Sequence, residues 1–242
     1  MVDEKIIVVL TQYKRNHLKK QLELIKKQSV QPDYLIVFQN ENHVDIEPLK
    51  KEFDFIHIKS DYNTKFFGRF AACFTFPVDI CMVFDDDIMP NHDTIKHYSS
   101  ECLRLNGIVG HNCRYSYLNN SISERKRRHS LMVRRNQEAD FVGHLWCFKK
   151  DWLYYMFSIK PFTYDTGEDM HLCYSCKIRG GIKSYLCSQP SKSCIADNTD
   201  GTIAADKFSS YITTPKELRV NVERYFVENF GLETLKSINR KV

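Results

Sequence analysis

The sequence lacks any hydrophobic run long enough to cross a lipid bilayer. Its apolar runs, such as the five-residue runs Ile6–Leu10 and Ile80–Phe84, are all short, whereas a membrane helix needs about 20 residues. The first residues, Met-Val-Asp-Glu-Lys, also lack the basic region and small-residue cleavage site of a secretory signal. We therefore expect a soluble protein without a transmembrane segment, located in the cytoplasm, and in the host-cell cytoplasm if the chain is viral.

Glycine and proline are scarce. Nine Gly and seven Pro among 242 residues are too few for a collagen-like or low-complexity chain, and a hydrophobic fraction of 43% argues against disorder. Neither glycine-rich phosphate-binding pattern, G-x-x-x-x-G-K-[ST] or G-x-G-x-x-G, occurs. If the protein binds a nucleotide, a metal ion and basic side chains must hold its phosphates in place of a glycine loop.

The nine cysteines form an odd set. Without a secretion signal we expect reduced thiols, most of them buried as small apolar side chains. Cys173 and Cys176, with Cys187 and Cys194 downstream, offer four ligands for zinc. However, the first pair falls in a helical pattern, and the second pair has six residues between its members, so core cysteines are the favoured interpretation.

Apolar segments alternate with helical or polar ones in the first half of the chain. Ile6–Leu10, Tyr34–Phe38, Phe53–Ile58 and Asp79–Phe84 read as strands. This order predicts an α/β protein with a mostly parallel central sheet flanked by helices and joined by right-handed crossovers. The second half is less regular and predicts a smaller mixed region. With no repeat or clear linker, we expect a single domain, 1–242, made of two halves, 1–106 and 107–242.

Several helix boundaries can be predicted from local signals. Residues 63–76 read as a helix, and Asn91 reads as the N-cap of the helix that follows it. A helix after Gly167 should stop at Gly180-Gly181. Thr214-Pro215-Lys216-Glu217 reads as a capping box with proline at the first helical position, opening a final helix.

Polar residues follow three of the predicted strands. Thr11 ends the first, Asn40 ends the second, and Asp85-Asp86-Asp87 directly follow the fourth. In parallel sheets the ligands bind at the carboxyl ends of the strands. The three loops are therefore expected to converge on one site.

The acidic triplet is the most informative stretch. Adjacent carboxylates repel one another, and burial beside a strand would raise their pKa values. A hard divalent cation such as Mg²⁺ or Mn²⁺ removes this conflict, because it prefers carboxylate and phosphate oxygens. Asp85 and Asp87 can then differ in role, one binding the metal and the other a ribose hydroxyl or a metal-bound water. The alternative is a surface turn that caps the next helix.

Taken together, these pieces resemble the GT-A family of nucleotide-sugar-dependent glycosyltransferases, over roughly residues 5–190. The triplet looks like the D-x-D motif of that family, and Gly167-Glu168-Asp169 after the strand 141–148 looks like its acidic acceptor-side element. The stretch 164–172 also resembles glycosyltransferases of large algal viruses. The remaining matches are Thr11-Gln12-Tyr13-Lys14-Arg15, Gln39-Asn40, Asn63 and Phe67-Gly68-Arg69.

The resemblance implies a donor site, a metal site and a catalytic pair. It implies that residues 1–106 bind the nucleotide and that 107–242 bind the acceptor. The donor is expected to be a UDP-sugar, the transferred group a hexosyl or pentosyl unit, the acceptor a glycan or other hydroxyl compound, and the cofactor Mn²⁺ or Mg²⁺ at Asp87 and Asp85. Asp169 and Glu168 would act in catalysis, with Asp169 as the base of an inverting reaction. Inverting and retaining mechanisms both stay open. The donor-binding residues would be Thr11, Gln12, Tyr13, Arg15, Asn40, Asn63, Arg69, Asp85 and Asp86.

Two aromatic and two histidine side chains are further candidates. Trp146 and Trp152 can stack on an acceptor sugar or serve as core, and core is favoured for Trp152. His144 is a candidate acceptor contact, and His144 and His171 are each possible third metal ligands or phosphate partners, although a lone histidine is more often structural.

Two other functions compete with glycosyl transfer. A sugar nucleotidyltransferase also uses an α/β nucleotide fold with acidic metal sites, but it would need a nucleoside triphosphate. Six basic residues within 125–135 carry much of the net charge of +5, and such a tract can bind nucleic acid, fold over the site as a lid, or remain a solvated loop. Because the acidic triplet marks the predicted cleft, we expect no nucleic-acid partner. The sequence makes no prediction of oligomeric state.

Overall fold

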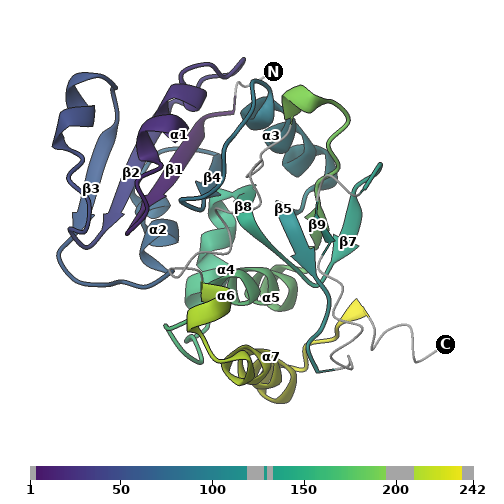
Figure 1. Ribbon diagram of the computed structural model, residues 1–242. Coiled ribbons are helices and arrows are strands. Elements are labelled where there is room, and N and C mark those ends of the chain that lie inside the picture. Colours follow the sequence, from purple (N-terminus) through teal and green to yellow (C-terminus); the bar gives the residue numbers. More distant parts are fainter. Residues whose placement is uncertain (1–3, 119–127, 130–132, 195–209, 236–242) are drawn as a thin grey trace.

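One sheet runs through the protein. The computed structural model describes residues 4–118, 128–129, 133–194 and 210–235 (Figure 1). Within these residues nine strands pair in the order β3-β2-β1-β4-β8-β5-β9-β7, with β6 pairing against β5. The strands are β1 (Ile6–Gln12), β2 (Tyr34–Asn40), β3 (Ile56–Ser60), β4 (Ile80–Phe84), β5 (Ile108–Arg114), β6 (Arg128–His129), β7 (Gln137–Ala139), β8 (Phe141–Lys149) and β9 (Ser184–Leu186).

The first four strands are parallel and the rest of the sheet is mixed. β1 lies between β2 and β4, and β3 pairs with β2, all in parallel. Next to them, β8 runs antiparallel to both β4 and β5, while β9 runs parallel to β5. The predicted α/β architecture, with a parallel half and a mixed half, is confirmed. The division of function between residues 1–106 and 107–242 stays a prediction.

Helices flank the sheet on either side in Figure 1, with α1 and α3 in the upper part of the view and α4, α5 and α7 in the lower part. The α-helices are α1 (Leu18–Ile25), α2 (Gly68–Ala71), α3 (Thr94–Leu105), α4 (Leu153–Ser158), α5 (Glu168–Gly180), α6 (Ser210–Thr213) and α7 (Lys216–Phe230). The short 3₁₀ segments are η1 (Glu47–Lys51), η2 (Ala72–Thr75), η5 (Lys150–Trp152) and η6 (Lys192–Cys194).

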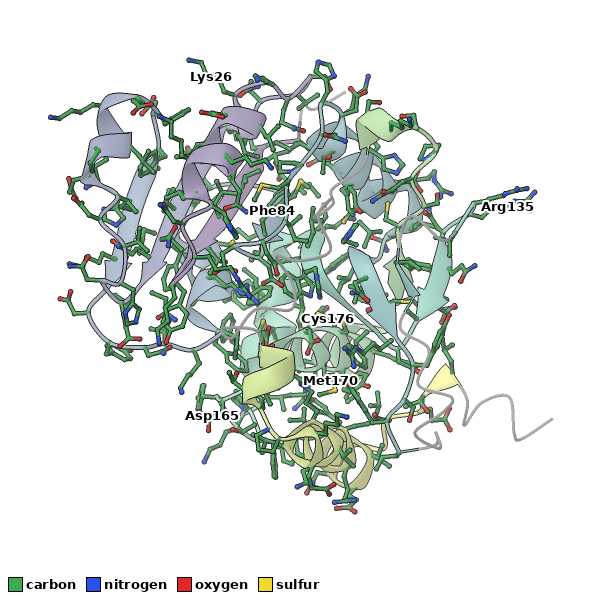
Figure 2. All side chains as sticks on the ribbon, in the orientation of Figure 1. Lys26, Phe84, Arg135, Asp165, Met170 and Cys176 are labelled. Atoms are coloured by element: carbon green, nitrogen blue, oxygen red, sulfur yellow. The ribbon has the colours of Figure 1, made fainter. Side chains whose placement is uncertain are left out.

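The hydrophobic patterns explain these elements. The first strand reads Ile-Ile-Val-Val-Leu and is buried on both faces, as expected for a central parallel strand. In α1 the buried apolar residues are Leu18, Leu22 and Ile25, which repeat at helical spacing toward the sheet. Helix α5 packs on β8 and α4, and α7 packs on α5. Met170 and Cys176, labelled in Figure 2, belong to the buried side of α5.

Three predicted helix boundaries were wrong, and the predicted strand 53–58 is shifted to β3 (Ile56–Ser60). The stretch 63–76 is not one helix, because residues 63–64 are irregular, residues 65–67 form a turn, and only the short α2 and η2 follow. The N-cap of α3 is Asp93 rather than Asn91. The N-cap of α7 is Pro215 and has no side-chain cap bond, so Thr214 does not form the predicted capping box. Local cap signals failed because tertiary contacts decide where each helix begins.

The cysteines and the hydrophobicity of the helices bear on two expectations from the composition. The eight cysteines whose side chains are described are free and buried, which confirms their assignment to the core. None of the helices in the described part of the chain combines the length and apolar character that a membrane span requires.

Candidate active site

A cavity of about 960 Å³ opens at the carboxyl ends of the parallel strands, a volume in the range of small-molecule sites. The donor, metal and catalytic residues expected from the sequence, together with Trp146 and His144, make a set of fourteen, and thirteen of these line the cavity. The predicted residues that line the cavity are Thr11, Tyr13, Arg15, Asn40, Asn63, Arg69, Asp85, Asp86, Asp87, His144, Trp146, Glu168 and Asp169.

Gln12 is the predicted residue that is not part of the cavity lining. Its side chain is buried, and its amide nitrogen donates to the carbonyl oxygens of Tyr13 and Arg15. Gln12 therefore stabilises the loop that carries two lining residues. Strand alternation explains this, because neighbouring residues of a strand point to opposite faces.

One end of the cavity is built from a chain of amide hydrogen bonds. The Asn40 amide donates to Asn63 Oδ1 at 2.9 Å, and the Asn63 amide donates to the Tyr13 hydroxyl at 3.0 Å. Asn40 Oδ1 accepts from the backbone and hydroxyl of Thr64. These contacts join β1, β2 and the 63–65 turn, which are distant in sequence, into one polar surface.

The acidic turn is held from the side of α1. Gln21 is buried and donates through its amide to the carbonyl oxygens of both Asp85 and Ile88, each at 2.9 Å. Arg15 forms an ion pair with Asp86, and Thr11 donates to Phe84 O at 2.8 Å. Phe84, labelled in Figure 2, is the last residue of β4 and directly precedes the turn. The turn is therefore fixed before any ligand binds.

Asp87 is the least compensated of the three aspartates. Burial, followed by the charges of Asp85 and Asp86, raises its pKa to about 7. The Arg15 guanidinium is 3.9 Å away, and the buried Asp87 Oδ1 atom has no hydrogen-bond partner in the described part of the chain. A buried carboxylate oxygen without a partner is the environment that a divalent cation would relieve.

His144 completes a possible ligand set. One ligand atom from each of Asp85, Asp87 and His144 lies within 4.8 Å of the others, and no other such group of three His, Cys, Asp or Glu side chains occurs among the described residues. Two carboxylates and one imidazole suit a divalent transition metal such as Mn²⁺. The partnerless oxygen of Asp87 supports this fit.

A β-bulge places His144 in the cavity. Opposite β5, the register shifts between Gly110 and Asn112, so β8 carries an extra residue at this point. His144 has a φ of 68°, in the left-handed region that histidine rarely adopts, and its carbonyl accepts from Asp85 N at 2.9 Å. Strain of this kind is often retained at functional sites.

Arg69 connects the acidic turn to α5. Its guanidinium pairs with Asp85 and, at 2.9 Å, with Glu168, and it lies 4.7 Å from the ring of Trp146. Burial opposes the charged form of Arg69, but the two carboxylates outweigh it and raise its pKa. Burial is the largest influence on Glu168 and the charge of Asp169 is the next; together they raise the pKa of Glu168 to about 7, although the charge of Arg69 lowers it.

Asp169 lies beyond this pair in the cavity. Burial raises its pKa, while Arg219 is the largest of the opposing influences. Its Oδ1 atom accepts from the backbone of Met170, and its Oδ2 atom faces Gly143, at 3.7 Å from the position that a Cβ would occupy there. A half-buried carboxylate that lines the cavity and has an elevated pKa is suited to accept a proton.

Solved structures of another protein share this fold. Three structures of S. aureus TarS, a glycosyltransferase, align with the chain. One covers 76% of this chain and 37% of TarS, at 12% identity and a TM-score of 0.55. The structure of TarS 1–349 aligns over 77% of this chain and 61% of its own, at 14% identity and a TM-score of 0.55. The complex of TarS 1–349 with UDP aligns over 76% of this chain and 60% of its own, at 13% identity and a TM-score of 0.54.

The fold is GT-A-like. The chain spans less than two thirds of the length of each TarS structure, and the low identity limits the likeness to the fold. No protein-family model matches the sequence, and no curated protein matches it.

The far end of the cavity in this GT-A-like fold was not predicted from the sequence. Arg114 ends β5, Tyr117 follows that strand, Arg219 lies in α7, and all three line the cavity. Arg114 is the last residue of β5, so the rule that ligands bind at strand ends could have identified it. We find no sequence signal for Arg219, because α7 reaches the cavity only through tertiary packing.

The remaining histidine and tryptophan candidates are packed in the protein interior. His171 is buried, its Nε2 lies 2.8 Å from Met156 O, and it packs against Phe67 and Phe226. Trp152 is a core residue, as expected. Trp146 is also buried, and its indole donates to Val142 O. Its ring lies 4.7 Å from the Arg69 guanidinium and so helps to position it. Most of the basic segment 125–135 lies outside the described residues; Arg134 and Arg135 are described and exposed.

Proposed function

We propose that the protein is a metal-dependent glycosyltransferase that moves a sugar from a UDP-linked donor to a hydroxyl acceptor. The observation that carries this proposal is that one cavity is lined by a possible metal ligand set, Asp85, Asp87 and His144, and by the carboxylates of Glu168 and Asp169. The GT-A-like fold shared with TarS, which has been solved in complex with UDP, supports the same reading.

The donor would lie along the chain of polar contacts already described. Tyr13, Asn40 and Asn63 would receive the uridine, since their amide groups and the Tyr13 ring offer hydrogen bonds and a stacking surface. The diphosphate would lie at Asp85 and Asp87 with the metal ion. With no glycine loop in the sequence, this ion and Arg15 would compensate the phosphate charge.

The bound ion would act as a Lewis acid on the diphosphate leaving group. Mn²⁺ is favoured over Mg²⁺ because an imidazole nitrogen suits transition metals, whereas Mg²⁺ prefers an all-oxygen shell. The hexosyl or pentosyl identity of the sugar is not specified by these ligands.

Asp169 would accept the proton of the acceptor hydroxyl as that oxygen attacks the anomeric carbon and the bond to the diphosphate breaks. Its raised pKa makes it a more effective base than an exposed aspartate. Glu168, paired with Arg69, would orient the donor side. This assignment favours inversion of the anomeric centre, because Asp169 would act as a single base toward the acceptor hydroxyl.

The test combines binding and turnover. UDP affinity is measured by calorimetry with and without Mn²⁺ for the wild type, Asp87→Asn and Asp169→Asn, and UDP release is measured from a panel of UDP-sugars. Asp87→Asn should remove the metal-dependent part of UDP binding. Asp169→Asn should retain it and lower transfer about 100-fold or more, the scale of a general base.

Two results would contradict the proposal. One is UDP affinity that does not change with Mn²⁺ in the wild type, and the other is near wild-type transfer by Asp169→Asn. Turnover of a nucleoside triphosphate with a sugar phosphate, and none of a UDP-sugar, would indicate a nucleotidyltransferase instead.

A further inference from the structure

The cavity has two ends of opposite charge. Four carboxylates, from Asp85, Asp86, Asp87 and Glu168, line the donor end together with the guanidinium groups of Arg15 and Arg69. That end therefore carries an excess of two formal negative charges, which a divalent cation would balance. At the other end the described lining includes Arg114, Arg219 and Asp169, whose formal charges sum to +1.

Arg219 keeps its charge available in the described structure. Its hydrogen bonds go to neutral oxygens: the Thr166 hydroxyl at 3.3 Å, and the carbonyl and hydroxyl of Ser210 at 2.9 and 3.3 Å. Among the described residues it makes no direct ion pair with Asp169, although it lowers the pKa of Asp169 through space. A planar guanidinium whose partners are neutral is suited to bind a carboxylate or phosphate.

Arg114 is positioned by two stacked aromatic rings that line the cavity with it. It donates to the Tyr117 hydroxyl at 2.9 Å, and the Tyr117 ring stacks on Phe141 with centroids 5.7 Å apart and an angle of 23°. Tyr117, Phe141 and Arg114 all line the cavity. An apolar ring face beside a guanidinium suits a sugar that bears an acidic group, because the ring packs on the sugar while the cation binds the acid.

Helix α7 positions both Arg219 and the loop that carries Tyr117. Arg219 and Glu223 are four residues apart on α7, so they lie on one face of the helix. The fully buried Glu223 accepts from the Ser116 hydroxyl and from the Tyr117 backbone, and the buried Asp140 accepts from Ser116 N. The loop that carries Tyr117 and the helix that carries Arg219 are therefore locked to each other.

We propose that Arg114 and Arg219 form an acceptor subsite for an anionic group, so that the acceptor of this enzyme carries a phosphate or a carboxylate near the hydroxyl that is glycosylated. The inference rests on the proposed glycosyl transfer and specifies its acceptor class. Asp169 lines the same cavity as this subsite, so an acceptor anchored by its acid would present a hydroxyl to Asp169.

The test uses the full chain saturated with UDP and Mg²⁺, so that the diphosphate site is occupied. Dissociation constants are measured by calorimetry or ligand-observed NMR for three probes: glucose 6-phosphate, methyl glucuronide and the neutral methyl glucoside. We expect at least one anionic probe to bind about tenfold or more tightly than the neutral one, and the difference to shrink as salt is added. Comparison of glucose 6-phosphate with methyl glucuronide shows whether the subsite prefers a phosphate or a carboxylate.

The variants Arg219→Gln and Arg114→Gln should each remove most of this preference, and Arg219→Lys should retain part of it because the charge remains. Arg224→Gln is the matched control, since it removes the same charge from an exposed position of α7. UDP affinity measured on each variant reports whether the donor end is folded.

Equal binding of all three probes, no binding of the anionic probes, or an unchanged preference in Arg219→Gln and Arg114→Gln would each overturn the subsite. Failure of the proposed function is a different result, namely wild-type protein that does not bind UDP in a metal-dependent way.

Discussion

Arg69 and Glu168 are 99 positions apart in the sequence, and their side chains form a buried ion pair with an N–O distance of 2.9 Å. The same guanidinium pairs with Asp85. One arginine thus ties the end of β4 in the parallel half to the first turn of α5 in the mixed half. The two acidic elements of the site are held at a fixed separation by a group that belongs to neither.

Replacing Arg69 with methionine should destabilise the protein strongly. Methionine keeps much of the side-chain volume but leaves Asp85 and Glu168 without their counter-charge. Loss of one member of a buried ion network costs about 3–5 kcal/mol. Chemical denaturation monitored by circular dichroism measures this difference. Arg104→Met, at an arginine with an exposed i,i+3 ion pair, is the control and should cost about 1 kcal/mol or less. Equal effects of the two substitutions would contradict the proposed importance of the Arg69 network.

His144 can be tested without disturbing its backbone. Asparagine tolerates a positive φ better than most residues, so His144→Asn should keep the bulge while removing the imidazole. We expect the unfolding midpoint to stay within a few degrees, and the Mn²⁺-dependent part of UDP affinity to fall about tenfold or more, as for loss of one metal ligand. His144→Val should in addition lower stability by about 1–3 kcal/mol, because a β-branched residue is strained at this φ. Metal-dependent affinity that survives in His144→Asn would exclude His144 as a ligand.

The sequence predicted the parallel half well because its signals are local. Four apolar segments alternate with helical ones, and Thr11, Asn40 and the aspartate triplet follow directly after strands, so the strand-end rule was sufficient. The bulge at His144 could not be predicted, since it depends on how β8 pairs with Gly110 and Asn112 of β5, about 30 residues away. Arg219 was missed for the same reason: its place depends on the packing of α7 against α5.

Two glycines on the β5–β8 pair should respond differently to substitution. A Cβ at Gly110 would lie 2.5 Å from Val142 Cβ, so Gly110→Ala forces the strands apart and should cost about 1–3 kcal/mol. A Cβ at Gly143 would meet Asp169 Oδ2 at 3.7 Å and Trp146 at 3.8 Å, which are ordinary contacts, so Gly143→Ala should fold normally.

A larger side chain at Gly143 would fill the space in front of Asp169. Gly143→Leu should therefore lower glycosyl transfer about tenfold or more by misplacing the acceptor, with UDP affinity within about twofold of the wild type. Turnover and calorimetry together measure the two effects. Loss of UDP binding in Gly143→Leu would show that the space beside Asp169 belongs to the donor end.

Glu223 makes a specific prediction for the pH dependence of stability. Burial raises the pKa of this carboxyl in the folded protein, and Asp140 adds to the shift, while hydrogen bonds from Ser116 and Tyr117 oppose it. Between the ordinary pKa of glutamate and the folded value, the folded state binds more protons than the unfolded state. The contribution of Glu223 to stability is therefore greatest below its unfolded pKa and is lost as the pH rises through the folded value.

Glu223→Gln removes this titration while keeping an oxygen that can accept from Tyr117 N. Because the other groups titrate alike in both proteins, the free energy of unfolding of Glu223→Gln minus that of the wild type should become more positive as the pH rises from about 4 to about 8. Denaturant unfolding at several pH values measures this difference. Glu217→Gln, which removes a carboxylate from an exposed position of the same helix, is the matched control. A difference for Glu223→Gln that becomes more negative with rising pH would mean that the folded protein favours the charged carboxylate, because the bonds from Ser116 and Tyr117 outweigh burial.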